Sequence, residues 1–184
     1  AMTAALIAIL VEEGKLDLDM TLAEIFPEEA EKAKKSNKKI TVRQLLHHRS
    51  GLRANFFWHG YSRKGSLRQQ RRRVVRDALK KKLEYKPGQK YLYSNLGYTV
   101  LGGIIEKVTD QSWETVIRQK LFKSLDMTRC GFGGTGTLGE IDQPWPHDQN
   151  GLPKEKNGPL MDNALVIVQF SISIIIIAGT LVIF

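Results

Sequence analysis

Cysteine is almost absent from this 184-residue sequence, where Cys130 is the single one. One cysteine cannot form an internal disulfide, so small disulfide-stapled scaffolds are excluded. The glycine-rich stretch 131–139 lacks the Gly-Lys-Ser/Thr ending of a phosphate-binding P-loop, which favours a simple connecting loop. No strand-like alternation of apolar and polar residues precedes Tyr93, so this part of the chain is predicted to be helical.

The four histidines lack the spacing of a metal site. His47 and His48 are adjacent, so on a helix they point to different sides. No other ligand stands at metal-site spacing from His59 or His147. We therefore predict no metal and no cofactor. His48 stands at the end of a predicted helix, where a polar capping role is favoured over catalysis.

Positive charge is concentrated in one segment. The formal net charge is +9, and residues 60–90 alone carry twelve Lys or Arg against Asp77 and Glu84. The simplest interpretation is an amphipathic helix whose charged side chains face water. Binding of nucleic acid or anionic lipid is the alternative, which is not favoured because no aromatic interleaving or nucleic-acid motif accompanies the charges. Apolar residues recur there at helical spacing: Leu67, Val74, Val75, Ala78, Leu79 and Leu83.

Several helices are predicted before this segment from their caps. Residues 2–11 are apolar on nearly every side, as in a buried helix, and Gly14 suits the turn after its end. Thr21-Leu22-Ala23-Glu24 and Thr41-Val42-Arg43-Gln44 each fit a capping box at a helix start. The charged stretch 28–39 is only weakly periodic, so we predict a surface connection there.

A longer helix is predicted after Asn95. Gly102-Gly103 in its interior lowers helix propensity, which suggests that another element approaches closely. Ser112 fits the cap of a following helix. The expected buried stripe of the long helix is Leu96, Val100, Leu101, Ile104, Ile105 and Val108, and that of the next helix is Val116, Ile117, Leu121 and Phe122.

Tyr93 and Asn95 are the candidate functional residues. They place a phenol and a carboxamide two residues apart where the long helix begins. The backbone N–H groups and dipole of a helix N-terminus favour developing negative charge, which suits a proton shuttle. The structural alternative is that Ser94 or Asn95 caps the helix and that Tyr91, Tyr93 and Tyr98 are packing aromatics.

A set of short strings in a fixed order carries a resemblance. They are residues 2–6, 40–52, Pro87-Gly88 leading into Tyr93-Ser94-Asn95, 104–109, 121–123 and 143–147. Together they resemble the β-lactamase-related serine hydrolases, the group of class C β-lactamases, DD-peptidases and esterases, over residues 1–163. The resemblance implies a mainly α chain, the helical portion of the β-lactamase/transpeptidase-like α/β fold, with its sheet largely missing.

The same resemblance implies acyl transfer through a serine ester. In such enzymes a Ser-x-x-Lys motif supplies nucleophile and base, the tyrosine of Tyr-x-Asn relays the proton, and a Lys/His-x-Gly strand closes the site. By this resemblance Tyr93 is the catalytic relay and Asn95 the substrate-binding residue. The implied partner is a small-molecule or peptide acyl substrate.

Two of the three motifs are not in the sequence. The family pattern Lys-x-x-Thr-Ala, matched at Thr3-Ala4, places the lysine immediately before Ala1 and the serine three residues earlier. The third motif is expected after residue 184. We therefore expect a fragment that is inactive by itself. Asp110 and Asp126 stand where the family usually turns with glycine.

Residues 164–184 form a hydrophobic segment without any charge. Its length suits a transmembrane helix, in which case the membrane is a further partner. The alternatives are a core segment without its sheet, because residues 169–174 alternate as in a strand, or a shifted reading frame. We expect a helical region at 1–163 and this segment at 164–184, in a protein that is membrane-associated or exported.

Overall fold

The computed structural model describes residues 1–55, 64–128, 130–132 and 150. Within these residues the chain is helical, as predicted, and the only β-type pairing is an isolated antiparallel bridge between Thr21 and Thr41. The helices are α1 (Met2–Glu12), α2 (Leu22–Ile25), α3 (Pro27–Ala30), α4 (Lys35–Lys38), α5 (Val42–Leu46), α6 (Leu67–Lys80), α7 (Asn95–Thr109), α8 (Trp113–Ile117) and the π-helical turn η1 (Arg118–Phe122).

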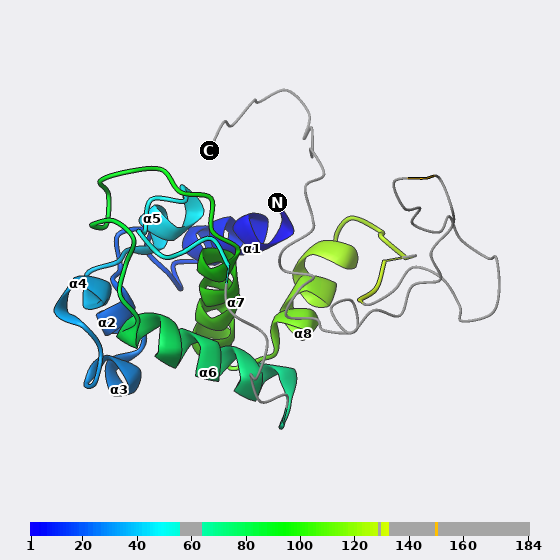
Figure 1. Cartoon of the computed structure of the whole chain (residues 1–184). Coiled ribbons are helices and arrows are strands. Elements are labelled where there is room, and N and C mark those ends of the chain that lie inside the picture. The colour runs from blue at the N-terminus through cyan, green and yellow to red at the C-terminus, as the bar shows by residue number, and fades with distance from the viewer. Residues whose placement is uncertain (56–63, 129, 133–149, 151–184) are drawn as a thin grey trace.

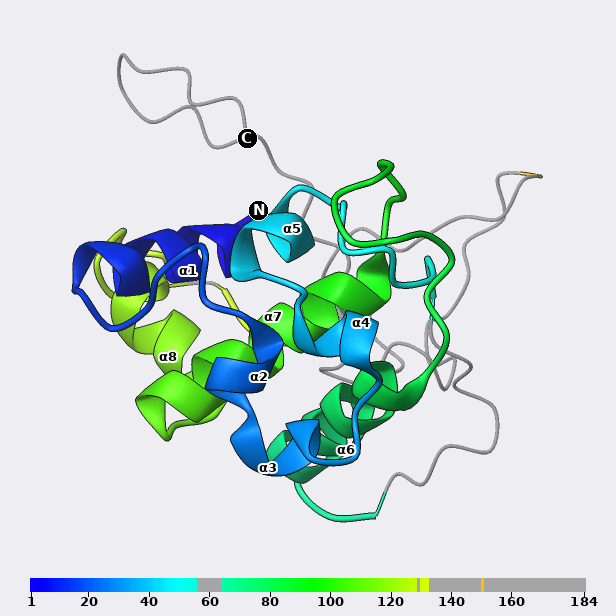
Figure 2. The same cartoon turned by 90° about the vertical axis from the view of Figure 1, so that its left-hand side faces the viewer.

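Helix α7 lies at the centre of the arrangement (Figure 1). It packs against α1 and α5 near one end and against α6, which crosses it near the other end. Figure 2 gives the same arrangement from the side. The predicted apolar stripe is confirmed except at its last member, because Val108 is only partly buried. The five fully buried members are Leu96, Val100, Leu101, Ile104 and Ile105.

The predicted close approach at Gly102-Gly103 is confirmed at Gly103. A Cβ atom there would lie 2.6 Å from Cγ2 of Val75, which belongs to α6. Real Cβ atoms do not come so close to another carbon, so the absence of a side chain lets α6 and α7 pack directly. Val75 itself is fully buried at this crossing.

The predicted caps also form. Both capping boxes are present, at Thr21–Glu24 and at Thr41–Gln44. Gly14 adopts a φ of +67° just after α1, as its place after the helix end requires. Asp110 and Asp126 adopt left-handed φ values of 56° and 51°, so both aspartates make the turns at which the resemblance implies glycine.

The stretch 28–39 lies mostly at the surface, as predicted, but it is not a simple connection. This stretch contains most of α3 and all of α4, and Pro27 begins α3 with its fixed φ. Asn37 in α4 is fully buried, and its side-chain N–H groups donate to the backbone oxygens of Ala78 and Lys81, each at 2.9 Å. Tertiary bonds to the end of α6 therefore compensate for the weak local periodicity.

The prediction that the charges of α6 face water is wrong for Arg71, whose side chain is 0% exposed. Its guanidinium contacts Glu106 of α7 at 2.8 Å and Glu114 of α8 at 2.6 Å. Glu106 also accepts the backbone N–H of Trp113 at 3.0 Å. This buried cluster, Arg71–Glu106–Glu114, ties together the ends of three helices.

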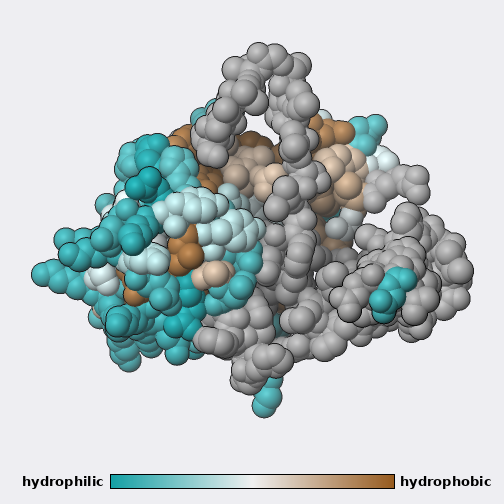
Figure 3. All heavy atoms as spheres, turned by 45° about the horizontal axis from the view of Figure 1, so that its top comes forward, coloured by the Kyte–Doolittle hydropathy of each residue, from teal (hydrophilic) through white to brown (hydrophobic). Residues whose placement is uncertain are grey.

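In Figure 3 the left-hand part of the molecule, where α3 and α4 lie in Figure 1, is mostly hydrophilic. Hydrophobic residues gather towards the middle of that view. None of the described helices combines the length and apolar character needed to cross a bilayer. The segment 164–184 lies outside the described residues, as do most of the glycine-rich stretch, His59 and His147.

Candidate active site

The candidate site lies where α7 begins, and Ser94 makes its N-cap. The Ser94 Oγ accepts the backbone N–H of Gly97 at 2.9 Å and donates to the backbone oxygen of Arg53 at 2.7 Å. The sequence allowed either Ser94 or Asn95 as the N-cap of this helix, and in the structure the N-cap is Ser94. The cap also fixes the start of α7 to the segment that follows α5.

Asn95 is the first residue of α7 and is partly exposed. Its backbone N–H donates to the oxygen of Ala54 at 2.8 Å, and its side-chain N–H group donates to Oδ1 of Asn55 at 2.7 Å. No described residue donates to Oδ1 of Asn95, so the carboxamide keeps an acceptor for another group. The sequence gave no signal for Asn55, because the contact joins segments 40 residues apart.

Tyr93 directly precedes the cap and is 41% exposed. Within the described part of the chain its hydroxyl has no hydrogen-bond partner. Tyr98, one turn into α7, differs because its hydroxyl donates to the oxygen of Leu46 at 3.3 Å. Burial, followed by the neighbouring Tyr93 and Tyr91, raises the pKa of Tyr98 and keeps its phenol protonated. Tyr93 is thus the better placed of the two for proton transfer.

His48 is the functional candidate that sequence reasoning missed. His48 does end α5, as predicted, but through its backbone, because it follows the C-cap His47 and its N–H donates to the oxygen of Leu45 at 3.1 Å. Its side chain takes no part in this cap and contacts the segment before α7. Its Nδ1 accepts the backbone N–H of Ser94 at 3.1 Å, and its backbone oxygen accepts that of Leu92 at 2.8 Å. Its ring centroid lies 4.5 Å from that of Tyr93.

Burial lowers the pKa of His48, and the backbone nitrogen of Ala1 lies near enough to its ring to act on it. The start of α1 therefore lies close to His48. In Figure 1 the N-terminus, α5 and the upper end of α7 lie on the same side of the molecule. The ends of three helices thus meet around Tyr93, where the α7 N-terminus favours negative charge. Such a site can stabilise a phenolate if a cation is supplied nearby.

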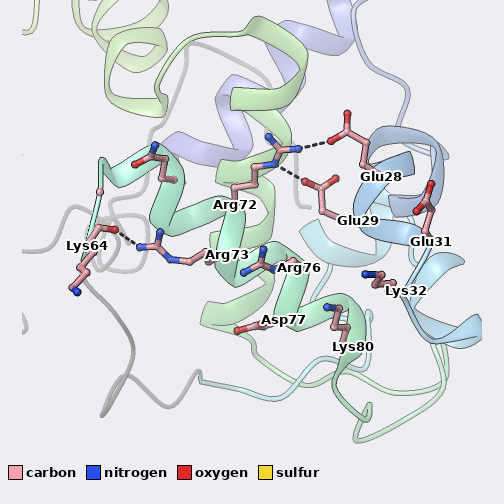
Figure 4. A pocket seen from close by; sticks show the side chains of 12 residues that line it. Glu28, Glu29, Glu31, Lys32, Lys64, Arg72, Arg73, Arg76, Asp77 and Lys80 are labelled. Atoms are coloured by element: carbon pink, nitrogen blue, oxygen red, sulfur yellow. Dashed lines mark hydrogen bonds and ion pairs between the residues drawn. The ribbon is translucent and has the colours of Figure 1, made fainter.

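A second candidate surface is the groove between α3 and α6, which encloses about 950 Å³ (Figure 4). Arg72 bridges Glu28 at 2.5 Å and Glu29 at 2.6 Å across it. The groove therefore combines both signs of charge, unlike the uniformly basic surfaces typical of nucleic-acid binding. Its charged lining residues are Glu28, Glu29, Glu31, Lys32, Lys64, Arg72, Arg73, Arg76, Asp77 and Lys80.

Comparison with protein families gives a match over most of the chain. The sequence model of the family described as Beta-lactamase matches residues 1–166. Among curated proteins, the N-acetylmuramyl-L-alanine amidase of Bacillus subtilis (strain 168) is 32% identical over 120 residues. These make up 63% of this chain and 27% of the amidase, so the chain spans well under a third of that relative.

Solved structures give the same fold. The octameric penicillin-binding protein homologue from Pyrococcus abyssi is 28% identical with a TM-score of 0.63, over 88% of this chain and 38% of that one. A D-stereospecific amidohydrolase from Streptomyces sp. is 25% identical with a TM-score of 0.60, over 78% of this chain and 45% of that one. The helices described above are therefore similar to part of a penicillin-binding-protein-like fold.

Proposed function

Because the chain belongs to the β-lactamase family of serine hydrolases, we propose that residues 1–163 are the helical part of such an enzyme and that Tyr93 is its proton relay. The observation that carries this proposal is the hydroxyl of Tyr93 beside the N-terminus of α7, with the carboxamide oxygen of Asn95 two residues later, because no described residue bonds to either atom. Tyr98, by contrast, is partly buried and its hydroxyl donates to the oxygen of Leu46.

The proposed nucleophile and lysine belong to a longer protein. From the match of Thr3-Ala4 to the family pattern, we propose that they lie just N-terminal to Ala1. In support, the start of α1 lies near His48 beside Tyr93. A lysine ammonium there would favour the phenolate form of a tyrosine. The proposed third motif lies C-terminal to the chain, on strands that complete the α/β fold.

The proposed reaction has two acyl-transfer steps. The serine Oγ attacks the substrate carbonyl, and its proton passes to the phenolate oxygen of Tyr93 and then to the leaving nitrogen or oxygen. The C–N or C–O bond breaks, leaving an acyl-serine ester. Water then attacks the ester, with its proton passing back through Tyr93 to the serine. Asn95 is proposed to hold the substrate with its carboxamide oxygen, which no described residue occupies.

We propose an amide or peptide bond as the substrate class. The support is that the relatives reported above are named as an amidase and an amidohydrolase. A carboxamide acceptor at Asn95 would suit the N–H of such a substrate better than an ester, which has no donor at that position.

A fluorophosphonate probe tests the assignment of the nucleophile. The 184-residue chain is expected to form no covalent adduct, whereas the longer protein forms one adduct, on the serine three residues before the lysine. Mass spectrometry of both proteins after identical treatment gives the answer. A stoichiometric adduct on any serine of the 184-residue chain would overturn the proposal.

A further inference from the structure

His48 adopts an unusual backbone conformation at the site. Its φ of 54° lies in the left-handed region, which is uncommon for a residue with a side chain and costs conformational energy. Two backbone hydrogen bonds hold this conformation. The N–H of His48 donates to the oxygen of Leu45 at 3.1 Å, and the N–H of Arg49 donates to the oxygen of Gln44 at 2.7 Å. These are the bonds of the turn that ends α5, and this turn leaves the His48 side chain in contact with the segment before α7.

The hydrogen bond to Ser94 defines the protonation state of His48. A backbone N–H can only donate, so Nδ1 of His48 must carry a lone pair, and the ring proton sits on Nε2. Protonating Nδ1 would set two N–H groups against each other at 3.1 Å. The bond therefore exists only while the imidazole is neutral.

The ring of His48 is surrounded by tyrosines. Its centroid lies 4.5 Å from that of Tyr93, 5.0 Å from Tyr98 and 5.8 Å from Tyr91, all within the range of aromatic contact. Burial around the ring also disfavours its charged form, which lowers the pKa of His48. Tyrosine faces attract an imidazolium, but this attraction competes with the lost bond to Ser94 and with burial.

We propose that neutral His48 is the positioning residue for Tyr93: its Nδ1 holds the Ser94 N–H, its ring supports the Tyr93 ring, and its protonation releases Tyr93 from the start of α7. The inference rests on the proposed role of Tyr93 as the proton relay. It adds a pH-sensitive contact between α5 and α7 that no family motif given above includes.

Nuclear magnetic resonance of the 184-residue chain labelled with ¹³C and ¹⁵N tests the positioning directly. At neutral pH the imidazole of His48 is expected to have an unprotonated Nδ1 and a protonated Nε2. On acidification below about pH 6.5, the reference value for histidine, the Tyr93 ring signals and the Ser94 amide signal are expected to shift together with His48. Tyr93 signals that stay constant while His48 titrates would overturn the proposal.

Two variants separate the contacts of His48. His48→Asn keeps a side-chain acceptor and tolerates a positive φ, so the Ser94 amide keeps its bonded signal while the Tyr93 signals lose their pH dependence. His48→Phe keeps the ring but loses the acceptor, so the Ser94 amide signal changes at every pH. His47→Asn is the matched control, because His47 is the exposed neighbour, and it leaves the Tyr93 titration intact. Persistence of the Tyr93 titration in both His48 variants would contradict the proposal.

Activity of the longer protein gives the second readout. His48→Asn is expected to remove the His48-dependent loss of kcat on the acid side, in addition to lowering kcat at neutral pH. If Tyr93→Phe leaves kcat unchanged, the proposed function fails even where the resonance titration is as expected. If Tyr93→Phe abolishes activity and the Tyr93 signals do not follow His48, the positioning role alone fails.

Discussion

The polar groups at the two ends of α7 differ in burial and in hydrogen bonding. Near its C-terminal end Glu106 is buried against Arg71 at 2.8 Å and accepts the N–H of Trp113, so this acceptor is used inside the protein. At its N-terminal end Tyr93 and Asn95 stand partly exposed, with a hydroxyl and a carboxamide oxygen that no described residue occupies.

The difference shows how one helix can serve both stability and function. A buried charge must be paired, because an unpaired one is strongly destabilising. A group meant to meet a substrate must instead remain open and be held by its neighbours. At the N-terminal end this holding falls to Ser94 and His48, whose bonds join α5 to α7. Substitutions at the two ends should therefore differ in what they damage.

The largest effect on stability is expected for Arg71→Ala. The substitution leaves Glu106 buried without its cation, which costs about 3–5 kcal/mol of unfolding free energy. Urea denaturation followed by circular dichroism measures the loss. Arg76→Ala is the matched control, because Arg76 is exposed on the same helix, and it should change stability by less than about 0.5 kcal/mol. Equal effects of the two variants would show that the buried cluster contributes nothing.

The next effect is expected at the α6–α7 crossing. Gly103→Leu forces a side chain against Val75, which should cost about 1–3 kcal/mol through overpacking. Adding Val75→Ala opens space beside it, so the double variant should be more stable than the sum of the two single losses predicts. Thermal unfolding of the unchanged protein, the two single variants and the double variant measures this double-mutant cycle. Strict additivity would mean that the two residues do not touch.

Ser94→Ala should have a smaller effect, at the other end of α7. Loss of an N-cap costs typically about 1 kcal/mol, and the bond to Arg53 is lost as well. Ser112→Ala is the comparison, because it removes the N-cap of α8, which follows the C-terminal end of α7. Ser94→Ala should also broaden the resonances of Tyr93, whereas Ser112→Ala should leave them sharp. The reverse pattern would contradict the assignment of Ser94 to the site.

The smallest expected effect is a change of stability with pH. The pKa of His48 is lowered in the folded protein, so below about pH 6.5 the unfolded chain binds a proton that the folded chain does not. Stability should thus fall as pH falls from about 6.5 to the folded pKa, and then level off until the carboxylates titrate. Urea midpoints between about pH 8 and pH 5 measure this slope, which His48→Asn should remove. A slope that is unchanged in His48→Asn must come from other groups.

Local signals in the sequence predicted much of the fold. The capping boxes at Thr21 and Thr41 were found because their partners stand three residues away. The stripe of α7 has the 3.6-residue period of a helix with one buried side. By contrast, the helices within 28–39 were missed because they depend on bonds of Asn37 to residues at the end of α6.

Long-range contacts explain what the sequence could not predict about the site. Arg71 looked like one charge among many, because its partners Glu106 and Glu114 are 35 and 43 residues away. The place of His48 at the end of α5 was predicted, but its side-chain contact was not, since Ser94 is 46 residues further along the chain. Tyr93 and Asn95 were identifiable because their spacing is local, although their catalytic and binding roles stay predictions.

The most direct test of the central claim is the turnover of the longer protein carrying Tyr93→Phe. Only one exposed hydroxyl is lost, so the unfolding free energy should change by less than about 0.5 kcal/mol. If Tyr93 relays the proton, kcat for an amide substrate should fall by about 10² to 10⁴. An unchanged kcat in a correctly folded Tyr93→Phe protein would contradict the account and return Tyr93 to a packing role.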